Sequence, residues 1–159
     1  MMKAREVSNF SFIEPMKALQ VGDLPVVNWV YELKFDGYRA LVFKADKDVR
    51  LVSRNRKAFA YPELVDALRL LSVKNAIIDG EITVLDDHGK FSCQLLQSYT
   101  ASRQATLVYY AFGLLFLDGT GLRSQPLAEH RKLLARLLKK APDNISGSPR
   151  SYGLREKSF

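Results

Sequence analysis

The stretch that decides the fold is WVYELKFDGYRALVFKA, residues 29–45. Apolar and polar residues alternate along it, and the alternation is interrupted at Asp36 and Gly37. Such alternation is typical of half-buried β-strands, and a glycine beside an aspartate favours a change of direction. We therefore predict two strands with a bend at Asp36 and Gly37, the second running from Arg39 to Lys44.

Outward from this stretch, the remaining chain predicts an alternation of short strands and amphipathic helices. Strands are expected at 49–53, 76–85 and 107–117, and helices at 62–72, from a Ser92 cap to about Tyr99, and at 126–140. The apolar run 107–117 is rich in aromatic residues and is followed by glycines, which favours a central strand over a helix. The fold class is α+β, with antiparallel sheets and packed helices.

The predicted helix at 126–140 is basic and amphipathic. Leu127, Leu134 and Leu138 share one face, with Leu133 and Leu137 at its edge, and Arg131, Lys132, Arg136, Lys139 and Lys140 occupy the rest. We expect the leucines to pack and Arg131, Lys132, Arg136 and Lys139 to remain in solvent. This surface would bind DNA weakly and with salt sensitivity. The alternative is an ordinary solvated helix face followed by a disordered basic end.

The composition limits the classes of protein that need to be considered. The 159 residues can form one core, and no segment has the apolar length of a signal peptide or a membrane span. The single Cys93 excludes an internal disulfide, and His88 and His130 lack metal-ligand spacing. A soluble cytoplasmic protein is expected, associated at most with the nucleoid and not with a membrane.

The net charge of +7 is unevenly distributed. Residues 123–159 carry 9 Lys and Arg against 3 Asp and Glu, so they account for +6 of the total. This excess is compatible with a polyanionic partner such as nucleic acid. Apolar periodicity stops after Ala141. We therefore predict a folded unit at 1–140 and an irregular or disordered basic tail at 141–159.

The segment before the bend concentrates charge on one side. If it is a strand, Glu32, Lys34 and Asp36 point one way, and Tyr31, Leu33 and Phe35 point the other. A surface ladder of ion pairs would explain this arrangement without any function. However, Gly37 permits close approach of backbone or ligand, and Arg39 adds a second cation that suits a phosphate-bearing nucleotide.

The string Glu32 to Arg39, ELKFDGYR, contains the KxDGxR signature of the covalent nucleotidyltransferases, which include polynucleotide ligases and RNA capping enzymes. Further matches follow in the family's order at Ser53-Arg54-Asn55, Asp79-Gly80-Glu81 and the strand YYAFGLLFLDG (109–119). The bacterial multifunctional end-joining ligases also share the neighbourhood of Glu14-Pro15-Met16 and the helix PLAEHRKLLARLL. Over about residues 12–140 the chain resembles most closely the ligase domain of bacterial multifunctional end-joining ligases.

The resemblance implies a ligase-type nucleotidyltransferase core, which is ATP-grasp-like. It also implies an ATP-dependent DNA ligase that acts in repair or recombination through a lysyl-AMP intermediate. The implied cofactors are ATP and Mg²⁺ or Mn²⁺, although no metal ligands are assigned. The implied partners are nicked or broken double-stranded DNA and other end-joining proteins.

The resemblance also implies a role for individual residues. Lys34 would be the nucleophile, and Asp36 would organise Lys34 and the metal. Glu32 would contact the adenine amino group, Arg39 and Glu81 the ribose, Phe112 the adenine ring, and Arg54 the phosphates or the DNA end. By strand parity, Glu81 lies off the apolar face of its strand. We predict that these side chains line one nucleotide-sized pocket.

The chain departs from the family in three respects. Gly113 replaces an aspartate, Arg56 replaces a glycine, and the family's EGxxxK strand, KxK pair and OB-fold are missing. The domain is therefore expected to be incomplete and C-terminally truncated. Alone it should not seal nicks, and it should self-adenylate feebly or not at all. The alternatives are a non-catalytic nucleotide- or DNA-binding remnant, and an RNA ligase or capping-type enzyme.

Overall fold

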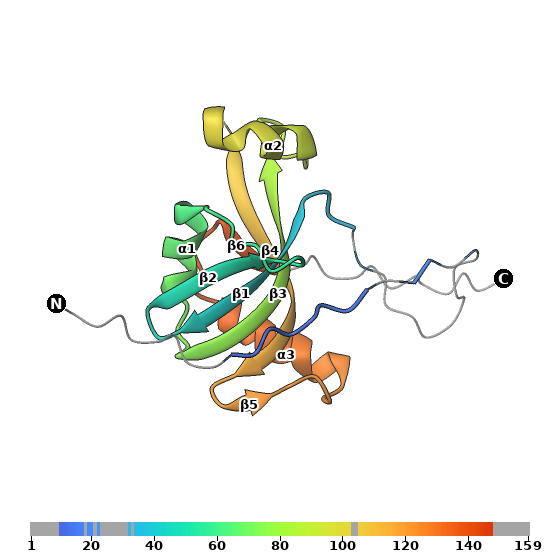
Figure 1. Ribbon diagram of the computed structural model, residues 1–159, viewed down its shortest axis with the longest axis vertical. Helices are drawn as coiled ribbons and strands as arrows, with labels where there is room; N and C mark the ends of the chain where they lie inside the picture. The colour runs from blue at the N-terminus through green and yellow to red at the C-terminus, as the bar shows by residue number, and fades with distance from the viewer. Residues whose placement is uncertain are drawn as a thin grey trace.

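A mixed β-sheet forms the centre of the protein (Figure 1). The computed structural model describes residues 10–17, 19–20, 22, 32, 34–102 and 105–147. Within them the chain runs through β1 (Tyr38–Ala45), β2 (Asp48–Ser53), α1 (Pro62–Arg69), β3 (Asn75–Leu85), α2 (Cys93–Ser102), β4 (Thr106–Leu117), β5 (Thr120–Gly121), α3 (Leu127–Leu138) and β6 (Ile145–Gly147). This mixture of sheet and helices confirms the predicted α+β class.

The strand order is β2-β1-β3-β4-β5, with β6 paired to β4 off this path. Neighbours in the main path are antiparallel, whereas β6 runs parallel to β4. β3 and β4 therefore lie inside the sheet, as their apolar sequences predict. The strands predicted at 39–44, 49–53, 76–85 and 107–117 are all confirmed.

The helices cover one face of the sheet. Leu64 and Leu68 of α1, Leu96 of α2 and Leu134 of α3 belong to one buried cluster, together with the inward side chains of the strands. α2 begins as predicted, because the backbone N–H of Leu95 donates to the Ser92 hydroxyl at 3.2 Å. The described helices are all too short to cross a membrane.

The opposite face of the sheet carries a smaller cluster, formed by Leu41, Phe43 and Ile77. The N-terminal segment packs on it through Phe10, Phe12 and Ile13. Side chains alternate between the faces of a strand, so Arg39, Asp79 and Glu81 share the face of Leu41 and Ile77. The polar residues of interest therefore lie on the face that the helical core leaves uncovered.

Two predictions about the chain segments are wrong in part. Glu32, Lys34, Phe35 and Asp36 are not in a strand, although Phe35 is buried while the three charged residues are exposed, as the predicted alternation requires. The rest of 29–33 lies outside the described residues. The predicted irregular tail contains β6, in which Ile145 is 4% exposed. Residues 148–159 lie outside the described part.

The basic helix also differs from its prediction at two positions. Leu127 is 52% exposed, because it stands at the first residue of α3, beyond the core. Arg131 is only partly exposed, because its guanidinium forms an ion pair with Glu32. Lys132, Arg136 and Lys139 are exposed, as predicted.

Candidate functional site

Two irregularities in the pairing of β3 with β4 shape the uncovered face. Asp79 pairs with Gly113 and Gly80 with Ala111, so Phe112 is an extra residue on β4. A second shift, next to Ile78, leaves Leu115 as another extra residue. Bulges of this kind redirect side chains and are common beside functional sites. Both bulged residues line the same pocket.

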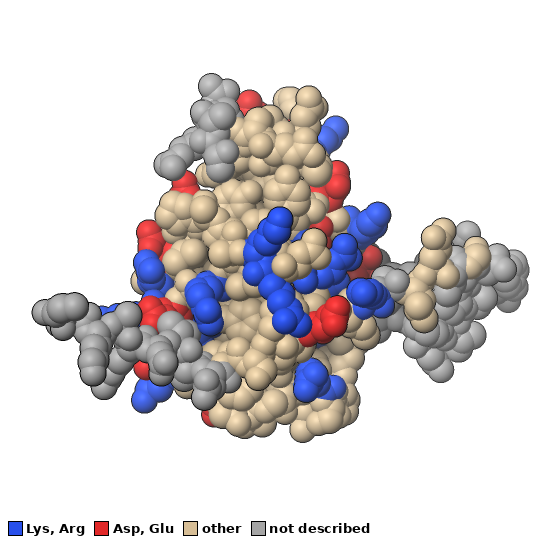
Figure 2. All heavy atoms as spheres, viewed as in Figure 1, with Lys and Arg blue, Asp and Glu red and all other residues tan. Residues whose placement is uncertain are grey.

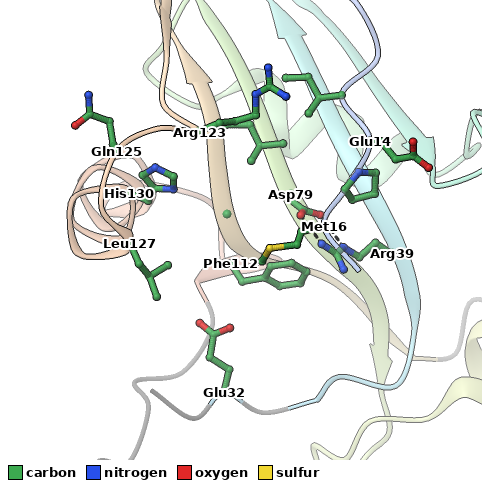
Figure 3. Close-up of a pocket in the computed structure, with 14 residues that line it drawn as sticks. Glu14, Met16, Glu32, Arg39, Asp79, Phe112, Arg123, Gln125, Leu127 and His130 are labelled. Atoms are coloured by element: carbon green, nitrogen blue, oxygen red, sulfur yellow. Dashed lines mark hydrogen bonds and ion pairs between the residues drawn. The ribbon is translucent and has the colours of Figure 1, made fainter. Parts of the chain in front are cut away.

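This pocket has a volume of about 510 Å³, which suits a nucleotide-sized ligand. Figure 3 shows Phe112 and Met16 near its centre, Arg39 and Asp79 on one side, Glu32 below, and Gln125, Leu127 and His130 opposite. The other lining residues are Ile13, Glu14, Pro15, Gly113, Leu115 and Arg123. The walls thus come from the N-terminal segment, the sheet and the start of α3.

Arg39 and Asp79 form a bidentate ion pair at the pocket wall. The Nε and Nη2 groups of Arg39 donate to Oδ1 and Oδ2 of Asp79 at 2.8 and 2.6 Å. This hydrogen bonding raises the pKa of Arg39, against the opposing effect of burial. The guanidinium carbon also lies 5.0 Å from the centre of the Phe112 ring, a cation–π distance. Arg39 is therefore fixed between a carboxylate and an aromatic ring.

Glu81 stands directly across the β1–β3 pair from Arg39. Burial raises its pKa, while the Gly37 backbone N–H and Arg39 act in the opposite direction. A Cβ on Gly37 would lie 2.1 Å from the Ile82 carbonyl oxygen, so only glycine permits this approach. The close approach brings the bend at Asp36 and Gly37 against Glu81.

Aromatic packing fixes the segment that carries Lys34. Phe35 is 6% exposed and stacks on Tyr110 with ring centres 4.5 Å apart. Phe91 meets Phe35 edge-on at 5.3 Å. Lys34 itself is exposed. Hence the backbone that follows Lys34 is anchored by packing, while the Lys34 side chain is exposed to solvent.

The structure brings only part of the predicted set to one pocket. Glu32, Arg39 and Phe112 line it, whereas Lys34, Asp36 and Glu81 are not among the described residues of its wall. Glu81 remains adjacent through its cross-strand position opposite Arg39 and its interaction with Asp36. Glu81 and Arg39 lie on the same face of the sheet.

Arg54 lines a second hollow of about 290 Å³ with Lys17, Arg39, Pro15 and Met16. Arg54 is exposed in the turn that follows β2. Figure 2 shows Lys and Arg side chains gathered over the middle of this face of the molecule. Arg39 lines both hollows, so the two are neighbours.

Several site residues were not predicted. Asp79, Met16, Leu127 and His130 line the pocket, although none was assigned a role from the sequence. Asp79 had a signal, because it shares a strand face with Glu81 and belongs to the quoted DGE string. Met16, Leu127 and His130 also belong to quoted strings, but these lie far from Arg39 in sequence, and no local pattern connects them to it.

The fold and the site define a protein class. A match to the ATP dependent DNA ligase domain family covers residues 13–153. The chain therefore belongs to this family.

Individual relatives agree with this assignment. The multifunctional non-homologous end joining protein LigD of Pseudomonas aeruginosa is 37% identical over 80% of this chain. DNA ligase C of Mycobacterium tuberculosis is 32% identical over 86% of it. Among solved structures, the ligase domain of M. tuberculosis LigD matches 77% of this chain with a TM-score of 0.63 and 31% identity. A mycobacterial DNA ligase D complexed with ATP and MES matches 74% with a TM-score of 0.60 and 31% identity.

The chain spans only part of these relatives. It covers 16% of the P. aeruginosa protein and 38% of the M. tuberculosis DNA ligase C. It covers 41% of the solved LigD ligase domain and 40% of the ATP complex.

Proposed function

We propose that this chain is the ATP-binding, adenylate-accepting part of a DNA ligase that acts in end-joining repair and recombination. The observation that carries the proposal is the pocket in which Glu32, Phe112 and the Arg39–Asp79 pair meet, in a chain of the ligase family. The ATP in the complex of a related mycobacterial ligase supports the choice of nucleotide.

In the proposed reaction, the neutral Nζ of Lys34 attacks the α-phosphorus of ATP. A P–N bond forms, the bond from the α-phosphorus to the bridging oxygen breaks, and pyrophosphate leaves with that electron pair. The ammonium proton passes to solvent, which the exposed side chain can reach. Phe35 supports this role, because its packing holds the backbone next to the nucleophile.

The pocket residues would bind the nucleoside. Phe112 offers a ring face for adenine, Glu32 an acceptor for its amino group, and Arg39 with Glu81 a pair of polar groups for the ribose. Phe112 needs no rearrangement of the strand to project, since it is the extra residue of a bulge.

A divalent cation would fit this site only together with the phosphates of the nucleotide. The described residues contain no group of three His, Cys, Asp or Glu that could hold a metal by themselves. Mg²⁺, however, commonly binds through one or two carboxylates together with substrate phosphates. Asp36 would serve as such a carboxylate, while Glu81, which interacts with it electrostatically, would contact the ribose. The cation, Mg²⁺ or Mn²⁺, would shield phosphate charge.

The hollow of Lys17, Arg39 and Arg54 would bind phosphate, either of the nucleotide or of a DNA end. Cations converging from separate segments suit a phosphate monoester better than a single surface charge does.

The proposed partners are nicked or broken double-stranded DNA and other end-joining proteins. The proposed location is the bacterial cytoplasm, where the DNA lies.

A second candidate is a nucleotide- or DNA-binding protein without ligase chemistry. Gly113, which lines the pocket, supports it, because the family's carboxylate is missing there.

The decisive experiment separates binding from chemistry. The purified chain is titrated with ATP and, in parallel, incubated with α-labelled ATP and Mg²⁺. We expect ATP binding that Phe112→Ala weakens about tenfold or more, and label far below stoichiometric that Lys34→Ala abolishes. Lys74→Ala, at an exposed lysine in the connection between α1 and β3, is the control. Binding without any Lys34-dependent label would favour the second candidate, and absence of ATP binding would refute both nucleotide proposals.

A further inference from the structure

An ion pair joins Glu32, two residues before Lys34, to Arg131 on α3. The partners are separated by 99 residues in sequence, and their side chains are 41% and 32% exposed. Figure 3 shows Glu32 at the edge of the pocket, below Phe112 and facing the wall that α3 provides. The ion pair therefore ties Glu32 to α3, the helix whose Leu127 and His130 line the opposite side of the pocket.

α3 is well fixed where it meets Glu32. Leu134, one turn beyond Arg131, is 5% exposed in the main core. His130, adjacent to Arg131, makes a hydrogen bond from Nε2 to the Leu122 carbonyl oxygen and lines the pocket. Arg131 consequently projects from a helix whose position relative to β4 is set by packing and hydrogen bonding.

The geometry of the ion pair restricts how Glu32 can meet a ligand. Nη2 of Arg131 donates to Oε1 of Glu32. A carboxylate accepts hydrogen bonds on both oxygens, so Oε2 can still accept from a ligand N–H. The 6-amino group of adenine is such a donor. The 6-oxo group of guanine is an acceptor and would face an unfavourable contact with the same oxygen.

We propose that Arg131 is a positioning residue that orients Glu32 and thereby sets the preference for 6-aminopurine over 6-oxopurine nucleotides. This inference rests on the proposed function, because it requires a purine in the pocket. Without Arg131, the Glu32 carboxylate loses the contact that fixes its direction. An acceptor that points in many directions discriminates poorly between an amino and an oxo group.

The test measures ATP and GTP affinities of the full chain by calorimetry. Arg131→Met, which keeps much of the apolar stem, should lower the ATP-to-GTP affinity ratio about tenfold, as expected for loss of one charge-assisted contact. Arg131→Lys should give an intermediate ratio. Lys74→Met, at an exposed position just before β3, should keep the wild-type ratio. Because Arg131 acts through Glu32, adding Arg131→Met to Glu32→Gln should change the ratio no further.

The outcomes separate this inference from the proposed function. A wild-type ratio in Arg131→Met and Arg131→Lys would overturn the role of Arg131 while leaving ATP binding intact. Equal weakening of ATP and GTP would indicate a structural role and would also overturn it. A wild-type chain that binds neither nucleotide would refute the proposed function and this inference together. If Arg131→Met does not fold, Arg131→Lys alone decides, because an unchanged ratio there contradicts the proposal.

Discussion

Asp79 and Gly113 face each other across β3 and β4 so closely that a Cβ on Gly113 would lie 3.1 Å from the Cβ of Asp79. The space for a side chain at position 113 is therefore restricted by the Cβ of the same aspartate whose carboxylate holds Arg39. Compared with the aspartate that the family usually has at this position, Gly113 therefore changes both the geometry and the charge of the site.

Gly113→Asp should destabilise the protein by about 1–3 kcal/mol at neutral pH, because a new side chain is forced against Asp79 and adds a like charge. The cost should shrink as the pH falls through about 4, where carboxylic acids become protonated. Denaturant unfolding from pH 4 to 7 measures this change. Gly113→Ala introduces only the steric effect, so its cost should stay constant with pH. Equal pH profiles for both variants would contradict the charge argument.

Glu81 should make stability depend on pH. Its folded pKa is raised, mainly by burial, so the folded protein holds this proton more tightly than the unfolded chain does. Stability should therefore fall as the pH rises from the ordinary glutamic acid pKa to the raised value, and then level off. Glu81→Gln should remove this fall. The stability of the variant minus that of the wild type should therefore be larger at pH 7 than at pH 4. Asp87→Asn, in an exposed turn, should leave the profile unchanged.

Arg56 has a backbone conformation that favours glycine. Its φ is +61°, in the left-handed region, and its guanidinium lies 4.8 Å from the centre of the Phe12 ring. Left-handed backbone costs a non-glycine residue about 1–2 kcal/mol, whereas an exposed cation–π contact contributes about 0.5–1 kcal/mol. Arg56→Gly should thus be neutral or stabilising by up to about 1 kcal/mol in thermal or denaturant unfolding. Arg56→Ala loses the contact without relieving the backbone, so it should be less stable than both.

The exposed cations of α3 should contribute to DNA binding. Replacing Lys132, Arg136 and Lys139 together by glutamine should reduce the slope of log affinity against log salt concentration by roughly 2–3, since each phosphate contact contributes about 0.9. The matched control replaces the exposed Lys47, Lys74 and Lys90 by glutamine. An identical loss in both triple variants would show that only net charge matters.

The hollow of Lys17, Arg39 and Arg54 should recognise a terminal phosphate. Lys17→Gln and Arg54→Gln should each reduce, by about tenfold, the preference for a nicked duplex with a 5′-phosphate over one with a 5′-hydroxyl, because each removes a charge-assisted contact. Lys57→Gln, in the same turn as Arg54, is the control. If the variants weaken ATP binding while the DNA preference is unchanged, the phosphate belongs to the nucleotide.

The elements with strong periodicity could be predicted from the sequence. β1 and β3 alternate clearly, and α1 repeats leucines at helical spacing, so their positions follow from side-chain burial alone. β6 could not be predicted, since only Ile145 of its three residues is buried and its partner lies more than thirty residues earlier. Leu127 was predicted to be buried because it lies on the apolar face of its helix. It is exposed, because it is the first residue of α3 and lies beyond the core.

The site was predictable only as far as local strings reach. Glu32, Arg39 and Phe112 belong to quoted motifs, and the pocket includes all three. Met16 and Arg131 also stand in quoted strings, but the contribution of Met16 to the pocket and the pairing of Arg131 with Glu32 depend on how distant segments pack, which no spacing encodes. The bulges that turn Phe112 and Leu115 into the pocket arise from the pairing of β3 with β4, so the strand sequence alone does not reveal them.

Strand β6 has a practical consequence for any shortened version of the protein. Its residues pair with Tyr109, Tyr110 and Ala111, and the Tyr109 N–H donates to the Asn144 carbonyl at 2.9 Å. Cutting the chain at residue 140 would expose the backbone of this stretch of β4 along an apolar strand. An uncovered edge of that kind is a template for intermolecular pairing. Expression trials that stop before Gly147 should therefore yield aggregates, and the minimal soluble fragment should retain these last three paired residues.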